Sequence, residues 1–248
     1  MEKKSSFLNK SNIINGWVHS ESISSLQILA SFDFDSITID LQHGMLDFEK
    51  CKNLIEIINL NNIFSIVRVP CNDIGIINKC LDAGAKGIIC PLINIQNDCK
   101  LFLDNCYYPP EGKRSFGPTI ASINDKNYFT NSNEEILSIA MIETKESVRN
   151  LDKILSLPKL DAIYVGPFDL SISYGHSPLE VYKQSDMLKL YESILKKAHQ
   201  FNKTVAIHCS GAETAGFFLK KGFDMVTLST DLNLLKSGID KEFALLNK

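Results

Sequence analysis

Short runs of β-branched and other apolar residues recur along the chain, and stretches with helical spacing separate them. The runs that predict strands cover residues 15–19, 36–41, 64–69, 87–90, 139–143, 162–165, 204–208 and 225–228. Between them, apolar side chains recur every three or four positions, which predicts helices over 22–30, 48–60, 72–83, 94–105, 146–155, 179–201, 211–221 and 232–246. Strand and helix therefore alternate from one end of the chain to the other.

This alternation predicts an α/β fold with a parallel sheet that is covered by helices. Eight strand–helix units in 248 residues predict that the sheet closes into an eight-stranded (β/α)8 barrel, the TIM barrel. An open doubly wound sheet is the alternative, but the chain lacks the glycine-rich first turn that such sheets use to bind nucleotides. We expect one domain over residues 1–248, with residues 1–14 as an N-terminal extension. Residues 106–133 are predicted to form a long, ordered loop, because several aromatic residues lie among its turn residues.

Composition narrows the range of functions. The chain is 44% hydrophobic and 22% charged, as expected for a globular domain, and its net charge of -3 gives no reason to expect a nucleic-acid or membrane partner. No apolar run follows the basic N-terminus, so no signal peptide is predicted, and no run approaches the roughly 18 apolar residues of a membrane span. The seven cysteines are odd in number and form no CxxC pair, which favours a reduced cytoplasmic protein without cysteine-bound zinc.

The candidate chemistry lies where the predicted strands end. In a barrel, the carboxyl ends of all strands face one side, here called the mouth. Glu143 and Asp169 follow adjacent strands, and two carboxylates suit a divalent cation such as Mg²⁺ or Mn²⁺. The alternative is that each acid caps a helix or pairs with a lysine.

Arg68 and His43 are the other candidates at the mouth. Arg68 ends an apolar strand, so it either holds a substrate carboxylate or enolate oxygen or forms a salt bridge with Asp40. His43 precedes a glycine, so it is accessible to act as a general base, although it can also be an ordinary loop histidine. Asp40 and Asp82 are candidate partners that would orient its ring.

Six segments together resemble the HpcH/HpaI family of class II, metal-dependent pyruvate aldolases. They are residues 39–44 (IDLQHG), 67–70 (VRVP), 81–88 (LDAGAKGI), 108–114 (YPPEGKR), 142–144 (IET) and 166–171 (GPFDLS). Their order and spacing carry the resemblance, which runs from about residue 15 to residue 238. It implies a TIM barrel that cleaves a 4-hydroxy-2-oxo acid to pyruvate and an aldehyde, or catalyses the reverse condensation.

The resemblance also implies roles for individual residues. Glu143 and Asp169 would bind Mg²⁺ or Mn²⁺, with Co²⁺ as a further option, and Arg68 would stabilise the enolate oxygen. His43 would be the general base, supported by Asp40 or Asp82. Backbone N–H groups of the turn Gly166-Pro167-Phe168-Asp169 would bind the pyruvate carboxylate.

Assembly and chemistry follow from the same resemblance. It implies a homo-oligomer, a hexamer or a trimer, in which the last helix is exchanged between neighbours and Asp82 acts across an interface. No lysine ends an apolar strand, which argues against a Schiff-base aldolase. Gln42, Met141 and Ser115 depart from the family pattern, so two alternatives stay open: another enolate-forming lyase, such as one acting on a CoA thioester, and a non-catalytic barrel.

Overall fold

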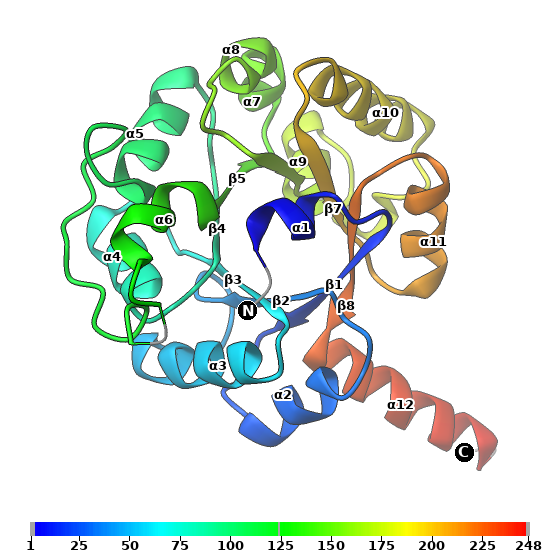
Figure 1. Cartoon of the computed structure of the whole chain (residues 1–248). Coiled ribbons are helices and arrows are strands. Elements are labelled where there is room, and N and C mark those ends of the chain that lie inside the picture. Colours follow the sequence, from blue (N-terminus) through cyan, green and yellow to red (C-terminus); the bar gives the residue numbers. More distant parts are fainter. Residues whose placement is uncertain (1–2, 124, 247–248) are drawn as a thin grey trace.

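Eight parallel strands form a closed barrel in the computed structural model, which describes residues 3–123 and 125–246. Neighbouring strands along the chain are neighbours in the barrel, and β8 pairs with β1 to close it (Figure 1). The strands are β1 (Ile13–Val18), β2 (Ser36–Asp40), β3 (Phe64–Arg68), β4 (Gly87–Cys90), β5 (Leu137–Ile142), β6 (Ala162–Val165), β7 (Thr204–His208) and β8 (Met225–Thr230). The predicted TIM barrel is confirmed.

Helices surround the barrel, as the alternating pattern predicts. They are α2 (Ile23–Ala30), α3 (Phe48–Leu60), α4 (Ile74–Asp82), α5 (Gln96–Cys106), α7 (Lys145–Arg149), α8 (Leu151–Leu155), α9 (Pro167–Tyr174), α10 (Ser185–Gln200), α11 (Ala212–Lys220) and α12 (Asp231–Leu245). Asp47 caps α3 by accepting a hydrogen bond from the N–H of Lys50, as its position before the helical repeat predicts. Within the described residues, no helix is both long enough and apolar enough to cross a membrane.

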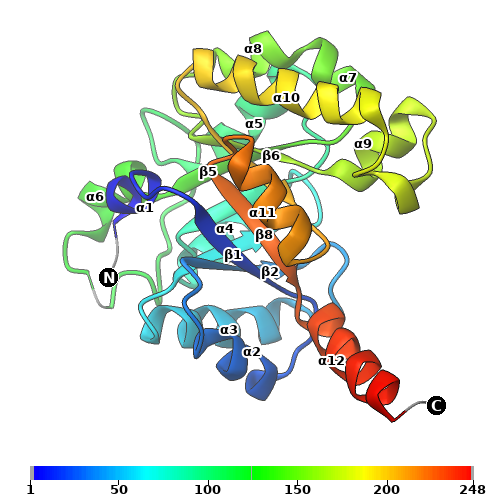
Figure 2. The same cartoon turned by 90° about the vertical axis from the view of Figure 1, so that its right-hand side faces the viewer.

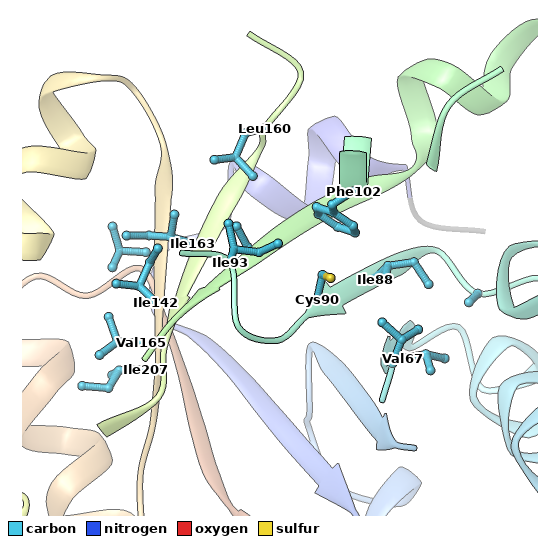
Figure 3. Packing of buried hydrophobic residues seen from close by; sticks show 14 of the residues in the cluster. Val67, Ile88, Cys90, Ile93, Phe102, Ile142, Leu160, Ile163, Val165 and Ile207 are labelled. Carbon is cyan, nitrogen blue, oxygen red and sulfur yellow. The ribbon is translucent and has the colours of Figure 1, made fainter. Parts of the chain in front are cut away.

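The barrel wall separates two hydrophobic cores. The outer core lies between strands and helices, and Figure 3 shows part of it, including Ile142, Ile163 and Val165 on the barrel wall. The inner core fills the barrel with side chains that include Trp17, Phe64 and Tyr164. Because both faces of each strand are buried, the strands read as continuous apolar runs rather than as an alternating pattern.

The N-terminal extension contains a short helix, α1 (Lys4–Leu8), that closes one end of the barrel. Phe7 is buried and stacks on Phe64 with a ring-centroid distance of 4.3 Å. Phe64 is the first residue of β3, so α1 lies at the end opposite the mouth, and Figure 1 shows it across the middle of the barrel. Lys4 Nζ also lies 3.1 Å from Asp161 Oδ1. The extension is thus part of the barrel core, and β1 begins at Ile13, two residues earlier than expected.

Besides α1, and the helix predicted over 146–155 that is divided into α7 and α8, three segments differ from the sequence-based expectation. The long loop contains a helix, α6 (Tyr128–Glu135), and the residues after Gly166 form helix α9 rather than a loop. The predicted helix over 179–201 is a 3₁₀ turn, η1 (Pro178–Glu180), followed by α10. The helix begins late because its buried repeat starts only at Met187, whereas Leu179 is exposed.

The last helix, α12, extends away from the barrel. Figure 2 shows it leaving the barrel beyond β8, with its C-terminal half far from the other helices. Its single buried residue in the described chain is Asp231, and its exposed residues include Leu235, Ile239 and Phe243. An apolar helix face that its own barrel does not cover is consistent with the predicted exchange between neighbours, which stays a prediction.

Candidate active site

The register of β2 and β3 places Asp40 beside Arg68 at the mouth. Arg68 Nε donates to Asp40 Oδ1 at 2.9 Å, and Arg68 Nη2 donates to Asp40 Oδ2. Both side chains are buried. The salt bridge expected as one alternative for Arg68 is therefore present. Arg68 Nη1 has no hydrogen-bond acceptor among the described residues. Asp40 therefore orients the guanidinium and leaves one of its nitrogen atoms able to donate to a ligand.

Asp40 also accepts hydrogen bonds from two other segments. Trp17 Nε1 donates to its Oδ2 at 3.1 Å, and His19 Nε2 lies 2.8 Å from the same oxygen. The backbone N–H groups of Gln42 and His43 donate to Oδ1 at 2.9 and 3.1 Å. Burial alone would raise the pKa of Asp40, but the hydrogen bonds from His19 and Arg68 outweigh it and hold the pKa far below its usual value. Asp40 is therefore an anion at all ordinary pH values.

His43 lies at the mouth and is accessible, as its place before a glycine predicts. Its side chain is exposed, and its ring has no hydrogen-bond partner among the described residues; only its backbone N–H contacts Asp40. The imidazole that Asp40 does hold belongs to His19, the first residue after β1. His19 is not among the site residues predicted from the sequence, although it directly follows a strand, as the predicted site residues do.

Glu143 follows β5 and is buried at the mouth, 3% exposed. Its Oε1 accepts a hydrogen bond of 2.7 Å from the N–H of Leu92, which sits in the turn after β4 with a left-handed φ of 53°. Burial raises the pKa of Glu143, and the negative charge of Asp169 adds to the rise, while the Leu92 hydrogen bond and the charge of Arg68 oppose it. The carboxylates of Glu143 and Asp169 and the guanidinium of Arg68 thus lie within electrostatic reach of one another.

Asp169 lies in the first turn of α9, and this turn packs closely against Glu143. Gly166 is the N-cap of α9 and Pro167 is its first residue. A Cβ on Gly166 would lie 3.0 Å from both Cβ and Oε2 of Glu143. The four residues Gly166 to Asp169 therefore form a helix N-terminus, whose free N–H groups and dipole attract anions.

The carboxylate pair fits a divalent cation bound by oxygen ligands. Among the described residues, no group of three or more His, Cys, Asp and Glu side chains is placed to hold a metal. Glu143 and Asp169 offer only oxygen donors, with Asp169 exposed and Glu143 buried. Mg²⁺ is commonly held by one or two carboxylates, with water and substrate oxygens as its other ligands, and Mn²⁺ also prefers oxygen donors. The donor set therefore suits these ions, and not zinc held by cysteine.

A neutral polar network fills the barrel beneath the mouth. The hydroxyl of Tyr164 lies 3.0 Å from His208 Nδ1 and 2.5 Å from Thr227 Oγ1, and Thr227 in turn accepts from Asn15. Burial lowers the pKa of His208 to about 3, and the positive charge of Arg68 contributes. His208 is thus a neutral residue at ordinary pH. Cys90 is likewise in the core, where burial raises the pKa of its thiol.

Asp82 is not at the mouth of its own barrel. It ends α4, five positions before β4 begins, so it lies at the end of the barrel opposite the mouth. Its Oδ1 accepts from Arg114 Nη2 at 2.7 Å, and the same nitrogen donates to the Tyr128 hydroxyl at 3.0 Å. Within one chain, Asp82 therefore does not support His43, and a catalytic role for it requires a neighbouring subunit.

The chain is similar to known proteins over most of its length. The family model described as HpcH/HpaI aldolase/citrate lyase matches residues 14–237. A hydroxypyruvate/pyruvate aldolase of Rhizorhabdus wittichii is 34% identical over 223 residues, which cover 90% of this chain and 89% of that protein. A 5-keto-4-deoxy-D-glucarate aldolase of Escherichia coli K12 is 28% identical over 226 residues, covering 88% and 85%.

The fold agrees with solved structures as well. A crystal structure of a family protein from Burkholderia cenocepacia has a TM-score of 0.90 at 22% identity, with 97% of each chain covered. At this identity the likeness concerns the fold, whereas the family match covers nearly the whole sequence. The chain therefore belongs to the HpcH/HpaI aldolase/citrate lyase family, and it is an aldolase, a carbon–carbon lyase.

Proposed function

We propose that this protein is a divalent-metal-dependent aldolase that cleaves a 4-hydroxy-2-oxo acid to pyruvate and an aldehyde, or catalyses the reverse condensation. The observation that carries the proposal is the grouping of Arg68, Glu143 and Asp169 at one barrel mouth in a chain of an aldolase family. The Rhizorhabdus relative is named a hydroxypyruvate/pyruvate aldolase. Hydroxypyruvate is therefore a second candidate for the 2-oxo acid that forms the enolate.

Arg68 has the position and the free donor that the reaction needs. When the bond between C3 and C4 breaks, negative charge develops on the oxygen at C2. A fixed cation aimed at that oxygen stabilises the transition state more than the substrate, which is the requirement for catalysis. Asp40 holds Nε and Nη2 of Arg68, and Nη1 is left for the substrate oxygen.

Glu143 and Asp169 would hold the metal, and the first turn of α9 would hold the carboxylate of the substrate. A divalent metal supplies Lewis-acid stabilisation for the same developing charge. The N–H groups of Phe168 and Asp169 lie in the first turn of α9, where backbone donors lack partners within the helix. Pro167 has no N–H, so the carboxylate site relies on the residues after it.

Oligomerisation is part of the proposal. The apolar face of α12, with Leu235, Ile239 and Phe243, would pack on a second copy of the chain in a hexamer or a trimer. Such an assembly is also what a catalytic role for Asp82 requires, because Asp82 lies away from the mouth of its own barrel. Light scattering on the purified protein tests this part, and a monomer would refute it.

The test of the activity follows the methyl protons of pyruvate in D₂O by NMR, with and without Mg²⁺ or Mn²⁺. Formation of the enolate exchanges these protons, so the assay requires no knowledge of the aldehyde. We expect exchange that depends on the metal, and loss of exchange in Asp169→Asn with an unchanged unfolding temperature, because barrel stability resides away from the mouth. Absence of exchange in the wild-type protein with either metal, with pyruvate and with hydroxypyruvate, refutes the proposal.

A further inference from the structure

The half-buried ring of His208, at the end of β7, lies between two aromatic side chains of the mouth. It packs edge-on against Trp17 with a ring-centroid distance of 5.0 Å and against Phe168 with one of 6.0 Å. The Trp17 ring also contacts the guanidinium of Arg68, whose Cζ lies 4.9 Å from the ring centroid, and Phe168 belongs to the first turn of α9. His208 is therefore next to both parts of the mouth that would hold a 2-oxo acid, the cation for its oxygen and the helix turn for its carboxylate.

The polar network inside the barrel determines which nitrogen of His208 carries the hydrogen. Oδ1 of Asn15 accepts from two hydroxyl groups of β2, so its Nδ2 is the donor to Thr227 Oγ1 at 2.9 Å. The Thr227 hydroxyl has one acceptor among the described residues, the oxygen of Tyr164. The Tyr164 hydroxyl in turn lies 3.0 Å from His208 Nδ1. Both hydroxyl hydrogens have acceptors only if Nδ1 accepts, so Nε2 carries the ring hydrogen.

Nε2 of His208 is the free end of this chain of hydrogen bonds. It has no hydrogen-bond partner among the described residues, and the atom is not fully buried. Burial and the positive charge of Arg68 lower the pKa of the ring to about 3, so the ring is a neutral donor at ordinary pH. A neutral donor with a fixed direction suits an uncharged oxygen of a ligand, such as a hydroxyl group.

The order of the strands indicates which part of a 2-oxo acid meets this donor. C2 of such an acid is planar and carries three groups, the carboxylate, the oxo oxygen and C3. The groups proposed to hold the oxygen and the carboxylate follow β3, β5 and β6, in Arg68, Glu143 and the first turn of α9. Strands β3 to β6 are consecutive and form one half of the barrel. C3 therefore points toward the other half, formed by β7, β8, β1 and β2, where His208 and Trp17 lie.

We propose that His208 determines which 2-oxo acid forms the enolate, by donating a hydrogen bond from Nε2 to a hydroxyl group on C3. The inference rests on the proposed aldolase function and deepens it, because it favours hydroxypyruvate, which has a hydroxyl group on C3, over pyruvate, which has none. When pyruvate is bound, its methyl group offers no acceptor to Nε2. Leaving a donor without a partner in a closed site is unfavourable, and this difference discriminates between the two acids.

The test measures enolate formation from both acids by exchange of their C3 protons in D₂O with Mg²⁺, against a blank without protein. The decisive quantity is the ratio of kcat/KM for hydroxypyruvate to kcat/KM for pyruvate, because a general loss of stability or of metal affects both acids alike. We expect His208→Leu, which has an apolar side chain without a donor, to lower this ratio by about 10-fold, the loss usual for one neutral hydrogen bond. His208→Gln, whose amide can donate, should keep most of the ratio.

Binding provides a second measurement that does not depend on turnover. Trp17 is the single tryptophan of the chain and contacts both Arg68 and His208, so its fluorescence reports ligands at this site. With Mg²⁺ present, His208→Leu should also lower the affinity for hydroxypyruvate relative to pyruvate by about 10-fold. His199→Leu is the matched control, because this ring pairs with Asp224 at the far end of the barrel, and it should keep both wild-type ratios.

The outcomes separate this inference from the proposed function. A wild-type protein that exchanges the protons of neither acid with metal refutes the aldolase proposal itself. If the wild-type protein exchanges pyruvate but not hydroxypyruvate, or if His208→Leu keeps the wild-type ratio, the inference is wrong and the aldolase proposal stands. Should His208→Leu fail to fold, His208→Phe provides the same test, because it keeps a ring between Trp17 and Phe168 and lacks the donor.

Discussion

Gly166→Ala is the most direct test of how the carboxylate site is built. A Cβ at this position would lie 2.9 Å from Met141 Cε and 3.0 Å from both Cβ and Oε2 of Glu143. The φ and ψ of Gly166 are -94° and 88°, so alanine meets no left-handed strain and the effect comes from contact alone. Met141 Cε is the end of a flexible side chain and can move. Glu143 cannot move freely, because the N–H of Leu92 holds its Oε1.

The added methyl group therefore shifts either the Glu143 carboxylate or the first turn of α9. Overpacking of this kind typically costs about 1–3 kcal/mol, and in a protein of this size 1 kcal/mol lowers the unfolding temperature by about 2–4 °C. Displacing a metal ligand or its support typically weakens metal binding by about 10–100-fold. We expect both effects in Gly166→Ala, a fall of several degrees in Tm and weaker binding of Mn²⁺.

Titration with Mn²⁺, followed by water-proton relaxation, measures the affinity, and calorimetry measures Tm. Gly216→Ala is the matched control, because no atom lies within 4 Å of its added Cβ and alanine favours the helix α11. The control should bind Mn²⁺ like the wild-type protein. If Gly166→Ala loses stability but binds Mn²⁺ normally, the group that the methyl group displaces, Glu143 or the first turn of α9, does not hold the metal. If neither quantity changes, the close approach of Gly166 to Glu143 is refuted.

Three other perturbations probe separate parts of the barrel. Arg68→Ala should lower kcat by roughly 10²-fold or more, because it removes the donor for the developing charge; an unchanged kcat excludes Arg68 from the chemistry. Phe7→Ala should cost about 3–5 kcal/mol of unfolding free energy in urea titrations and leave KM unchanged, since it opens the end of the barrel remote from the mouth; a changed KM with intact stability contradicts this. His208 has a pKa near 3 in the folded protein against 6.5 when unfolded, so only the unfolded state gains a proton between these values. Stability should therefore fall by roughly 1.4 kcal/mol per pH unit as the pH drops through this window, and His208→Gln should remove that part of the slope; identical slopes would show that His208 does not titrate this way.

The barrel could be predicted from the sequence because its strands have a strong and local signature. Parallel strands are buried on both faces, so each appears as an apolar run such as residues 36–41. In the helices between them, apolar residues recur every three or four positions. Once the barrel is known, the carboxyl end of every strand faces the mouth. That rule alone located Asp40, Arg68, Glu143 and the turn before Asp169, with no motif required.

The elements that were missed lack such a local signature. Helix α1 has five residues and a single buried side chain, Phe7, so its stability comes from the stack on Phe64, far away in the sequence. Helix α9 begins with Gly166 and Pro167, which read as a turn, although proline favours the first position of a helix. The partner of Asp40 was missed for the same reason. His43 is three residues away in sequence, but His19 is nearer in space through the pairing of β1 with β2.

The two predicted roles of Arg68, salt bridge and substrate donor, do not exclude each other. An unpaired arginine at the end of a buried strand would be costly, and an arginine that is fully paired would have no donor for a substrate. Asp40 meets both requirements, because it accepts hydrogen bonds from Nε and Nη2 of Arg68 and leaves Nη1 able to donate to a substrate. Its Oδ2 also accepts from Trp17, and Trp17 lies beneath the guanidinium, with Arg68 Cζ 4.9 Å from the ring centroid. The same carboxylate thus holds both the Arg68 guanidinium and the His19 imidazole, and the registers of β1, β2 and β3 set the relative position of these two groups.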